Sequence, residues 1–158
     1  MDWGRVEEAV PDLAAKVRGR IETHGLALLA TLRKDGGPRI SGIETLFGEG
    51  ELWIGMMPGS LKAKDLLRDP RLALHSATTD KMVKKGDAKL SGNALLVEDE
   101  ATFDAYRRAS AGSQGPELGT FYLFRVDVKE ISHLVPAGDH LDIEGWSEAG
   151  GYRQTNRY

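Results

Sequence analysis

The sequence has no cysteine, no long apolar run and no excess of basic residues. Without cysteine the chain cannot form disulfides, thiolate zinc sites, iron–sulfur clusters or a thiol nucleophile. No apolar stretch approaches the roughly 18 residues that a membrane-spanning helix needs. The 24 acidic residues outnumber the 21 basic ones, for a formal net charge of −3, which argues against a general nucleic-acid-binding protein.

The composition is that of a globular domain with many turns. The 158 residues suit one domain spanning 1–158, and 41 % of them are hydrophobic and available for a core. Glycine occurs 19 times, against roughly 11 expected from average composition, which is typical of short strands joined by tight turns. The acidic first residues, 1–8, lack the apolar segment of a signal peptide, so we expect a cytoplasmic protein.

Apolar spacing predicts one N-terminal helix followed by a series of strands. A helix over 11–24 is indicated by a proline in its first turn and by the apolar stripe of Leu13, Val17 and Ile21. Beyond it, apolar runs and alternating patterns separated by glycine turns are typical of β-strands. We expect strands at 26–32, 38–47, 52–56, 71–77, 89–97, 121–128, 131–135, 141–146 and 151–155, helices at 60–68 and 99–110, and loops at 79–87 and 111–116. This order predicts a mainly β fold, an antiparallel barrel with helical caps.

The segment 55–71 gathers groups that favour an anion. A strand ends there, the chain turns, and a helix begins with Ser60 at its cap. Free backbone amides, a hydroxyl and the ammonium groups of Lys62 and Lys64 then meet near one helix N-terminus, an arrangement that binds phosphate. Two residues apart is about 200° around a helix, so we expect at most one lysine to contact the phosphate. The alternative is that both lysines only form the solvated face of an amphipathic helix.

The order of elements around this segment resembles the split barrels related to pyridoxamine 5′-phosphate oxidase. The likeness lies in a helix, a Leu-rich strand, an Asp-Gly hairpin, a return strand, a Lys-x-Lys-Asp-Leu helix and the sequence Arg-Asp-Pro-Arg. It covers most of the chain, is clearest over 25–77, and is greatest for small actinobacterial members. This superfamily includes flavin- and deazaflavin-dependent oxidoreductases.

The resemblance implies an FMN-binding split β-barrel, antiparallel and dimeric, with the cofactor at the interface of a homodimer. It implies hydride transfer between FMN and a small planar substrate. The alternatives are a reductase that uses the deazaflavin coenzyme F420, and a non-catalytic protein that binds or stores flavin, deazaflavin or haem. No catalytic residue is identified, since the cofactor itself transfers the hydride. The cofactor-binding residues that the resemblance implies are Lys62, Ser60, Lys64, Arg39, Ser41, Met56 and Met57.

The C-terminal part departs from authentic pyridoxamine phosphate oxidases, which carry an Arg-x-His element for their pyridoxal substrate. Thr155 stands at the histidine position here, so we do not expect oxidation of vitamin B6. Nearby, Trp146, Tyr152 and Arg153 have roles that the sequence leaves open. Trp53, by contrast, is expected to fill the barrel core.

The histidines and a basic loop are the remaining candidates. His24, His75, His133 and His140 are not paired at metal-ligand spacing, so no metal site is expected. We interpret His75 as a hydrogen-bonded core residue, although either His75 or His133 could ligate a haem. The basic segment 81–85 is interpreted as a solvated loop, or as a patch that attracts the acidic tail of a deazaflavin.

Overall fold

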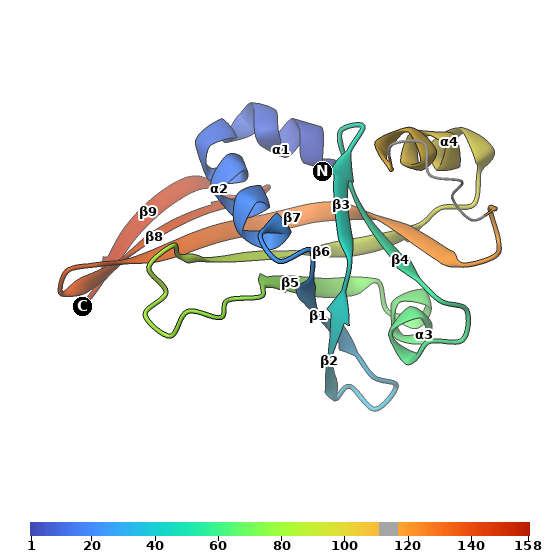
Figure 1. Cartoon of the computed structure of the whole chain (residues 1–158), viewed down its shortest axis with the longest axis horizontal. Helices are drawn as coiled ribbons and strands as arrows, with labels where there is room; N and C mark the ends of the chain where they lie inside the picture. Colours follow the sequence, from blue (N-terminus) through green and yellow to red (C-terminus); the bar gives the residue numbers. More distant parts are fainter. Residues whose placement is uncertain (111–116) are drawn as a thin grey trace.

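The computed structural model describes residues 1–110 and 117–158, so the predicted loop 111–116 lies outside the described residues. In the described part, nine antiparallel strands form one sheet that curls into a barrel, and four helices flank it (Figure 1). The mainly β, antiparallel fold expected from the sequence is confirmed. The elements are α1 (Trp3–Ala9), α2 (Pro11–Glu22), β1 (Ala27–Leu32), β2 (Pro38–Ile43), β3 (Thr45–Gly48), β4 (Glu51–Met56), α3 (Leu61–Arg68), β5 (Arg71–Ser76), β6 (Asp87–Leu96), α4 (Glu100–Ala109), β7 (Tyr122–Ala137), β8 (His140–Ser147) and β9 (Gly151–Arg157).

One stretch of chain joins the two edges of the sheet. The strand order is β2-β1-β5-β6-β7-β4-β3, so β2 and β3 are neighbours in sequence but lie at opposite ends of this order. β2 pairs with β1, whereas β3 pairs with β4, and the chain passes from one to the other at Glu44. The single strand predicted over 38–47 is therefore wrong. One straight strand cannot hydrogen-bond to both edges, and the break at Glu44 lets the segment close the barrel.

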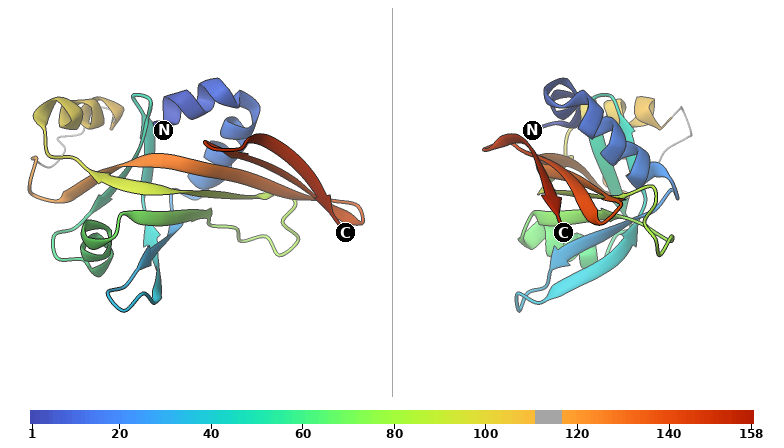
Figure 2. Two further views of the ribbon diagram at one scale, coloured as in Figure 1. Left: turned by 180° about the vertical axis from the view of Figure 1, so that it is seen from behind. Right: turned by 90° about the vertical axis from the view of Figure 1, so that its left-hand side faces the viewer.

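The strands predicted at 121–128 and 131–135 are also wrong as separate elements, because β7 is one strand of 16 residues. A bulge at Lys129 shifts the register against β6 between Ser91 and Gly92, and the pairing then continues. Gly92 permits this, since a Cβ there would fall 2.2 Å from a β7 carbonyl oxygen. The far half of β7 carries the β8–β9 hairpin, which extends away from the barrel (Figures 1 and 2).

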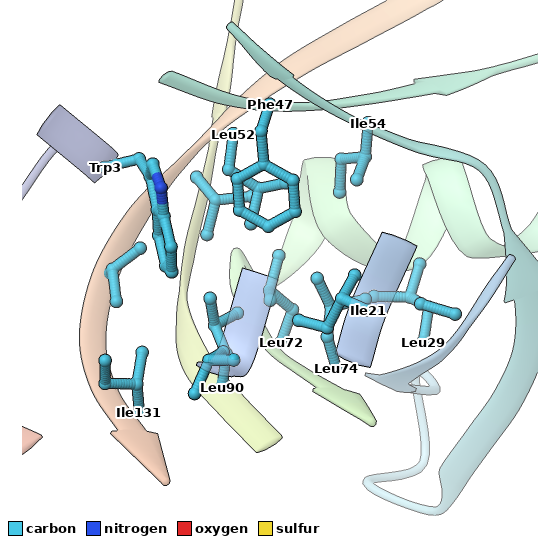
Figure 3. Packing of buried hydrophobic residues seen from close by; sticks show 14 of the residues in the cluster. Trp3, Ile21, Leu29, Phe47, Leu52, Ile54, Leu72, Leu74, Leu90 and Ile131 are labelled. Carbon is cyan, nitrogen blue, oxygen red and sulfur yellow. The ribbon is translucent and has the colours of Figure 1, made fainter. Parts of the chain in front are cut away.

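Helices α1 and α2 follow one another at an angle, contact each other and pack against the barrel (Figure 2). α2 buries the predicted stripe of Leu13, Val17 and Ile21. Helix α1 was not predicted from the sequence, because seven residues with two apolar anchors give little helical periodicity. Packing stabilises it instead: Trp3 meets the edge of Phe47 with ring centroids 4.7 Å apart (Figure 3). Within the described residues, no helix is long and apolar enough to cross a membrane.

Trp53 is buried, but not in the barrel core as predicted. It belongs to a second apolar cluster with Phe103, Leu123 and Val97, beneath α4. Its neighbour Ile54 points into the barrel (Figure 3), and consecutive residues of a strand face opposite sides. Of the residues whose roles the sequence left open, Trp146 belongs to the barrel core, whereas Tyr152 and Arg153 lie exposed on β9.

Candidate functional site

Helix α3 begins directly after β4, at the lower right of Figure 1, and its first turn offers hydrogen-bond donors. Gly59, with φ +80°, makes the turn, and Ser60 caps the helix, its Oγ accepting from the Ala63 amide at 3.3 Å. In the described part of the chain, the amides of Leu61 and Lys62 have no acceptor. A hydroxyl and two unpaired amides thus lie at the positive end of the helix dipole, as an anion requires.

Lys62 and Lys64 diverge, as their spacing predicts. Lys62 is half-buried, and its Nζ donates to the backbone carbonyl of Gly42 on β2 at 2.8 Å. Lys64 is exposed and faces a different hollow, described below. Lys62 therefore lies between the start of α3 and β2, the strand that also carries Arg39 and Ser41.

Arg39 is held in place by Asp65, a residue that sequence reasoning did not single out. Asp65 is 3 % exposed and accepts hydrogen bonds from Arg39 Nε at 2.6 Å, Thr31 Oγ1 at 2.9 Å and Arg68 Nη2 at 3.2 Å. Burial alone would raise the pKa of Asp65, but these three bonds outweigh it and lower the pKa. The available signal was an acidic residue on the buried face of α3, where a charge requires partners.

The remaining predicted cofactor-binding residues differ in how exposed their side chains are. Ser41 lies half-buried on the same face of β2 as Arg39, in the predicted alternation that ends with the buried Ile43. Met56 is 3 % exposed and packs in the barrel core, whereas Met57 is 79 % exposed. The structure thus brings Ser60, Lys62, Arg39 and Ser41 to the region where α3 meets β2, but it leaves the Met57 side chain in solvent.

A hollow of about 560 Å³ lies between the β1–β2 turn and α3, and we call it the cationic hollow. Among the described residues, the side chains of three of its cations have no ion pair or hydrogen bond. These are Arg33 and Lys34 from the turn and Lys64 from the helix. The lysines of segment 81–85, expected either in a solvated loop or in a patch for an acidic tail, do not line this hollow. Those lysines are exposed, and no pocket described in the structure includes them. The hollow is lined by Arg33, Lys34, Asp35, Arg39, Leu61, Lys64, Asp65 and Arg68.

The histidines are placed apart from α3. The Nδ1 of His75 lies 2.6 Å from the carbonyl oxygen of Ser76, so the expected hydrogen bond is present. The expected core position is wrong, because the side chain is 37 % exposed. His133 is buried, and burial lowers its pKa. No group of three or more His, Asp or Glu among residues 1–110 and 117–158 is arranged to hold a metal ion. Thr155, at the expected histidine position, is exposed on β9.

The comparisons with known proteins identify one family. The sequence matches the family model of pyridoxamine 5′-phosphate oxidase over residues 13–134. No curated protein matches it significantly. Among solved structures, PhzG from Burkholderia lata in complex with tetrahydrophenazine-1-carboxylic acid has a TM-score of 0.65 at 13 % identity, covering 96 % of this chain and 91 % of that one.

Two further solved structures share the fold. A pyridoxamine 5′-phosphate oxidase-related, FMN-binding protein from Nostoc punctiforme has a TM-score of 0.64 at 13 % identity, with 96 % of this chain and 95 % of that chain covered. A haem-binding protein from Mycobacterium smegmatis has a TM-score of 0.52 at 15 % identity, with 90 % and 87 % covered. At such identities these structures show a common architecture alone. The family model, in contrast, matches most of the chain, from α2 to β7, and the match includes β2 and α3. The chain therefore belongs to the pyridoxamine 5′-phosphate oxidase family, as its split barrel and the order of its elements indicated.

Proposed function

We propose that this chain is an FMN-dependent oxidoreductase that holds the cofactor phosphate at the start of α3 and acts on a small planar substrate. One observation carries the proposal: the Ser60 hydroxyl and two unpaired amides lie on the helix that also directs Lys62 toward β2. Membership of a family with FMN-binding relatives supports it.

The residues present fit a phosphate. Ser60 and the first-turn amides supply neutral donors, and the Lys62 ammonium supplies a full positive charge. Asp65 fixes Arg39 through Nε, and among the described residues the two terminal nitrogens of Arg39 make no hydrogen bond. These nitrogens are donors that an anion can use. In this proposal Ser41 lines the cofactor groove beside Arg39.

FMN, when bound, supplies hydride transfer, and the protein binds, orients and shields it. The backbone of Met56 and Met57 leads from β4 into the α3 turn, and in this proposal it meets the edge of the flavin ring. Neither methionine contributes an ionisable group, so in this proposal their backbone only positions the ring.

The phosphate assignment is tested by replacing Lys62 with alanine. We expect Lys62→Ala to weaken FMN binding by about tenfold or more, as for a lost charge-assisted contact, and to leave riboflavin binding nearly unchanged. Fluorescence titration of both ligands measures the effect. Lys64→Ala is the matched control, because Lys64 lies on the same helix but diverges from Lys62. An equal loss of FMN and riboflavin affinity contradicts the assignment.

The proposal includes a homodimer with the cofactor at the interface. A hollow of about 500 Å³ opens on the sheet face formed mainly by β1, β5, β6 and β7, and its lining is mostly apolar. Leu28 is 43 % exposed there and Ile40 is 74 % exposed, which favours burial against a second copy of the chain. Light scattering tests this: we expect a dimer for the wild type and a monomer for Ile40→Asp. A monomeric wild type contradicts it.

A second candidate is a reductase that uses a deazaflavin cofactor, and the cationic hollow favours it. Three unpaired cations beside Arg39 suit a ligand that continues beyond its phosphate with further carboxylates. Combined Arg33→Gln, Lys34→Gln and Lys64→Gln changes should then weaken binding of the deazaflavin more than binding of FMN. Neutralising the lysines of the 81–85 loop is the control. If only that change weakens deazaflavin binding, the acidic tail of the deazaflavin binds to the loop and not to the cationic hollow. The absorption spectrum of the protein from its own host distinguishes FMN, deazaflavin and haem directly.

A further inference from the structure

A hollow on the outer side of the β3–β4 hairpin, away from the barrel core, has chemistry opposite to that of the cationic hollow. It lies between the hairpin, the middle of α4 and the residues just before β7, and its volume is about 530 Å³. Figure 1 shows α4 beside this hairpin. We call it the aromatic hollow; the lining residues that matter here are Glu44, Trp53, Gly55, Tyr106 and Phe121. Its volume is in the range of small-molecule sites.

Gly55 keeps the aromatic hollow open. A Cβ at this position would fall 3.1 Å from the ring of Phe121, closer than most side chains pack. Gly55 is nevertheless exposed and lies within strand β4, where it pairs with Leu123 of β7. A glycine inside a strand is costly, and its presence often marks a place where a ligand approaches the backbone closely.

The walls of the hollow are flat aromatic rings that hold one another in place. Tyr106 lies edge-on to Trp53 with ring centroids 5.8 Å apart, and its centroid is 6.0 Å from that of Phe121. Trp53 is 1 % exposed, and its Nε1 donates to the Gly48 carbonyl at 3.0 Å. Trp53 is thus closed off, and the half-buried rings of Tyr106 and Phe121 are the ones that a planar ligand can pack against by stacking or edge contacts.

Two polar groups at the hollow have no partner among the described residues and can therefore interact with a ligand. Among the lining residues that the structure describes, Glu44 is the only charged one, and it forms no ion pair with the described part of the chain. The Tyr106 hydroxyl has no hydrogen bond there either, whereas the Thr120 hydroxyl already donates to the backbone carbonyl of Glu117 at 2.7 Å. Burial, and then the negative charge of Glu44, raise the pKa of Tyr106, so its hydroxyl stays protonated.

We propose that the aromatic hollow binds the substrate, that this substrate is a small planar aromatic compound with a positive charge or N–H donors on its edge, and that Glu44 determines this specificity. Compounds with a phosphate or carboxylate in this position meet an unpaired negative charge and, among the described lining residues, no cation. The assignment as a substrate site rests on the proposed function. Met56 and Met57 border the hollow and lead into the turn before Ser60, so it adjoins the proposed cofactor site.

The test compares three ligands that share one ring: benzamidine (cationic), benzamide (neutral) and benzoate (anionic). Each is titrated against the purified protein with and without FMN, with the Trp53 indole N–H signal followed by NMR. Trp53→Phe identifies that signal. The variants are Glu44→Gln and Glu44→Lys, with Glu8→Gln as the matched control, since Glu8 is an exposed carboxylate on α1 with no ion pair among the described residues.

We expect the wild type and Glu8→Gln to bind benzamidine about tenfold more tightly than benzoate, Glu44→Gln to lose that preference, and Glu44→Lys to reverse it. Equal affinities for benzamidine and benzoate in the wild type, no saturable change at Trp53 with any probe, or an unchanged preference in Glu44→Gln would overturn the proposal. An FMN titration of the same samples separates the two claims. Failure to bind FMN with the benzamidine preference intact removes the proposed function, whereas FMN binding without the preference removes only the Glu44 assignment.

Discussion

The two hollows on either side of the β4–α3 connection differ in charge and in the way they are built. The cationic hollow is formed by charged side chains around one buried carboxylate, Asp65, whereas the aromatic hollow is formed by rings around one glycine, Gly55. Polar atoms shape the first through hydrogen bonds, and the absence of a side chain shapes the second. A ligand that spans both needs an anionic end and a flat end without negative charge.

The largest expected effect on stability is that of a substitution at the cationic hollow. Asp65→Ala leaves the half-buried Arg39 without its buried partner, and removing one member of such a pair costs about 3 kcal/mol or more. For a chain of this size that corresponds to a fall in melting temperature of roughly 6–12 °C. Thermal unfolding followed by circular dichroism measures it. A melting temperature within a degree of the wild type would show that the network around Asp65 contributes nothing.

The same carboxylate gives a pH dependence with a defined sign. The pKa of Asp65 is lower in the folded protein than its ordinary value of 3.8, so its stabilising contribution is complete above that ordinary value and is lost as the pH falls through the folded pKa. Urea unfolding of the wild type and Asp65→Asn should therefore differ most near neutral pH and converge in acid. A difference that grows toward low pH contradicts this sign.

On the aromatic side, filling the hollow is expected to have an intermediate effect. In Gly55→Val the new side chain meets Phe121 and occupies the space for a ring, at a cost to stability of about 1–3 kcal/mol from overpacking. Benzamidine binding should fall by about tenfold or more, while FMN binding changes much less. The double variant Gly55→Val with Phe121→Ala should recover stability. Unchanged benzamidine affinity in Gly55→Val would place that ligand elsewhere.

The smallest expected effect is that of Lys64→Ala. Lys64 is exposed and has no side-chain partner among the described residues, so its removal should change the unfolding free energy by no more than about 0.5 kcal/mol. Chemical denaturation and an FMN titration measure both properties. A loss of FMN affinity as large as that of Lys62→Ala would mean that the cofactor extends into the cationic hollow.

The sequence predicted the strands and α3 well, because apolar periodicity and glycine turns are local signals. It missed the break at Glu44 and the continuity of β7, since both depend on which strand lies alongside. It also assigned Trp53 to the wrong cluster, although burial itself was correct, because period-two alternation does not say which side of a strand is the barrel interior. At the site, the cap at Ser60 and the divergence of the two lysines were predictable from helix geometry.

Asp65 and the aromatic hollow were not predictable in the same way. The partners of Asp65 lie on β1, β2 and α3, up to 34 residues away in sequence. The aromatic hollow combines residues from β3, β4, α4 and the segment before β7, and only the fold brings them together.

Because the chain passes from β2 to β3 between the two ends of the strand order, a ligand bound at α3 also affects how easily the barrel opens at the β2 edge. The hydrogen bonds from Lys62 to Gly42 and from Arg39 to Asp65 both connect α3 to β2, which lies at one end of the strand order. An anion held by these residues is bound only while that edge is docked, so binding stabilises the docked state by mass action. Amide hydrogen exchange should therefore slow in β2 and β3 when FMN is added, well before it changes in the central strands β6 and β7. The bound cofactor would then hold the β2 edge against α3 and keep the barrel closed there.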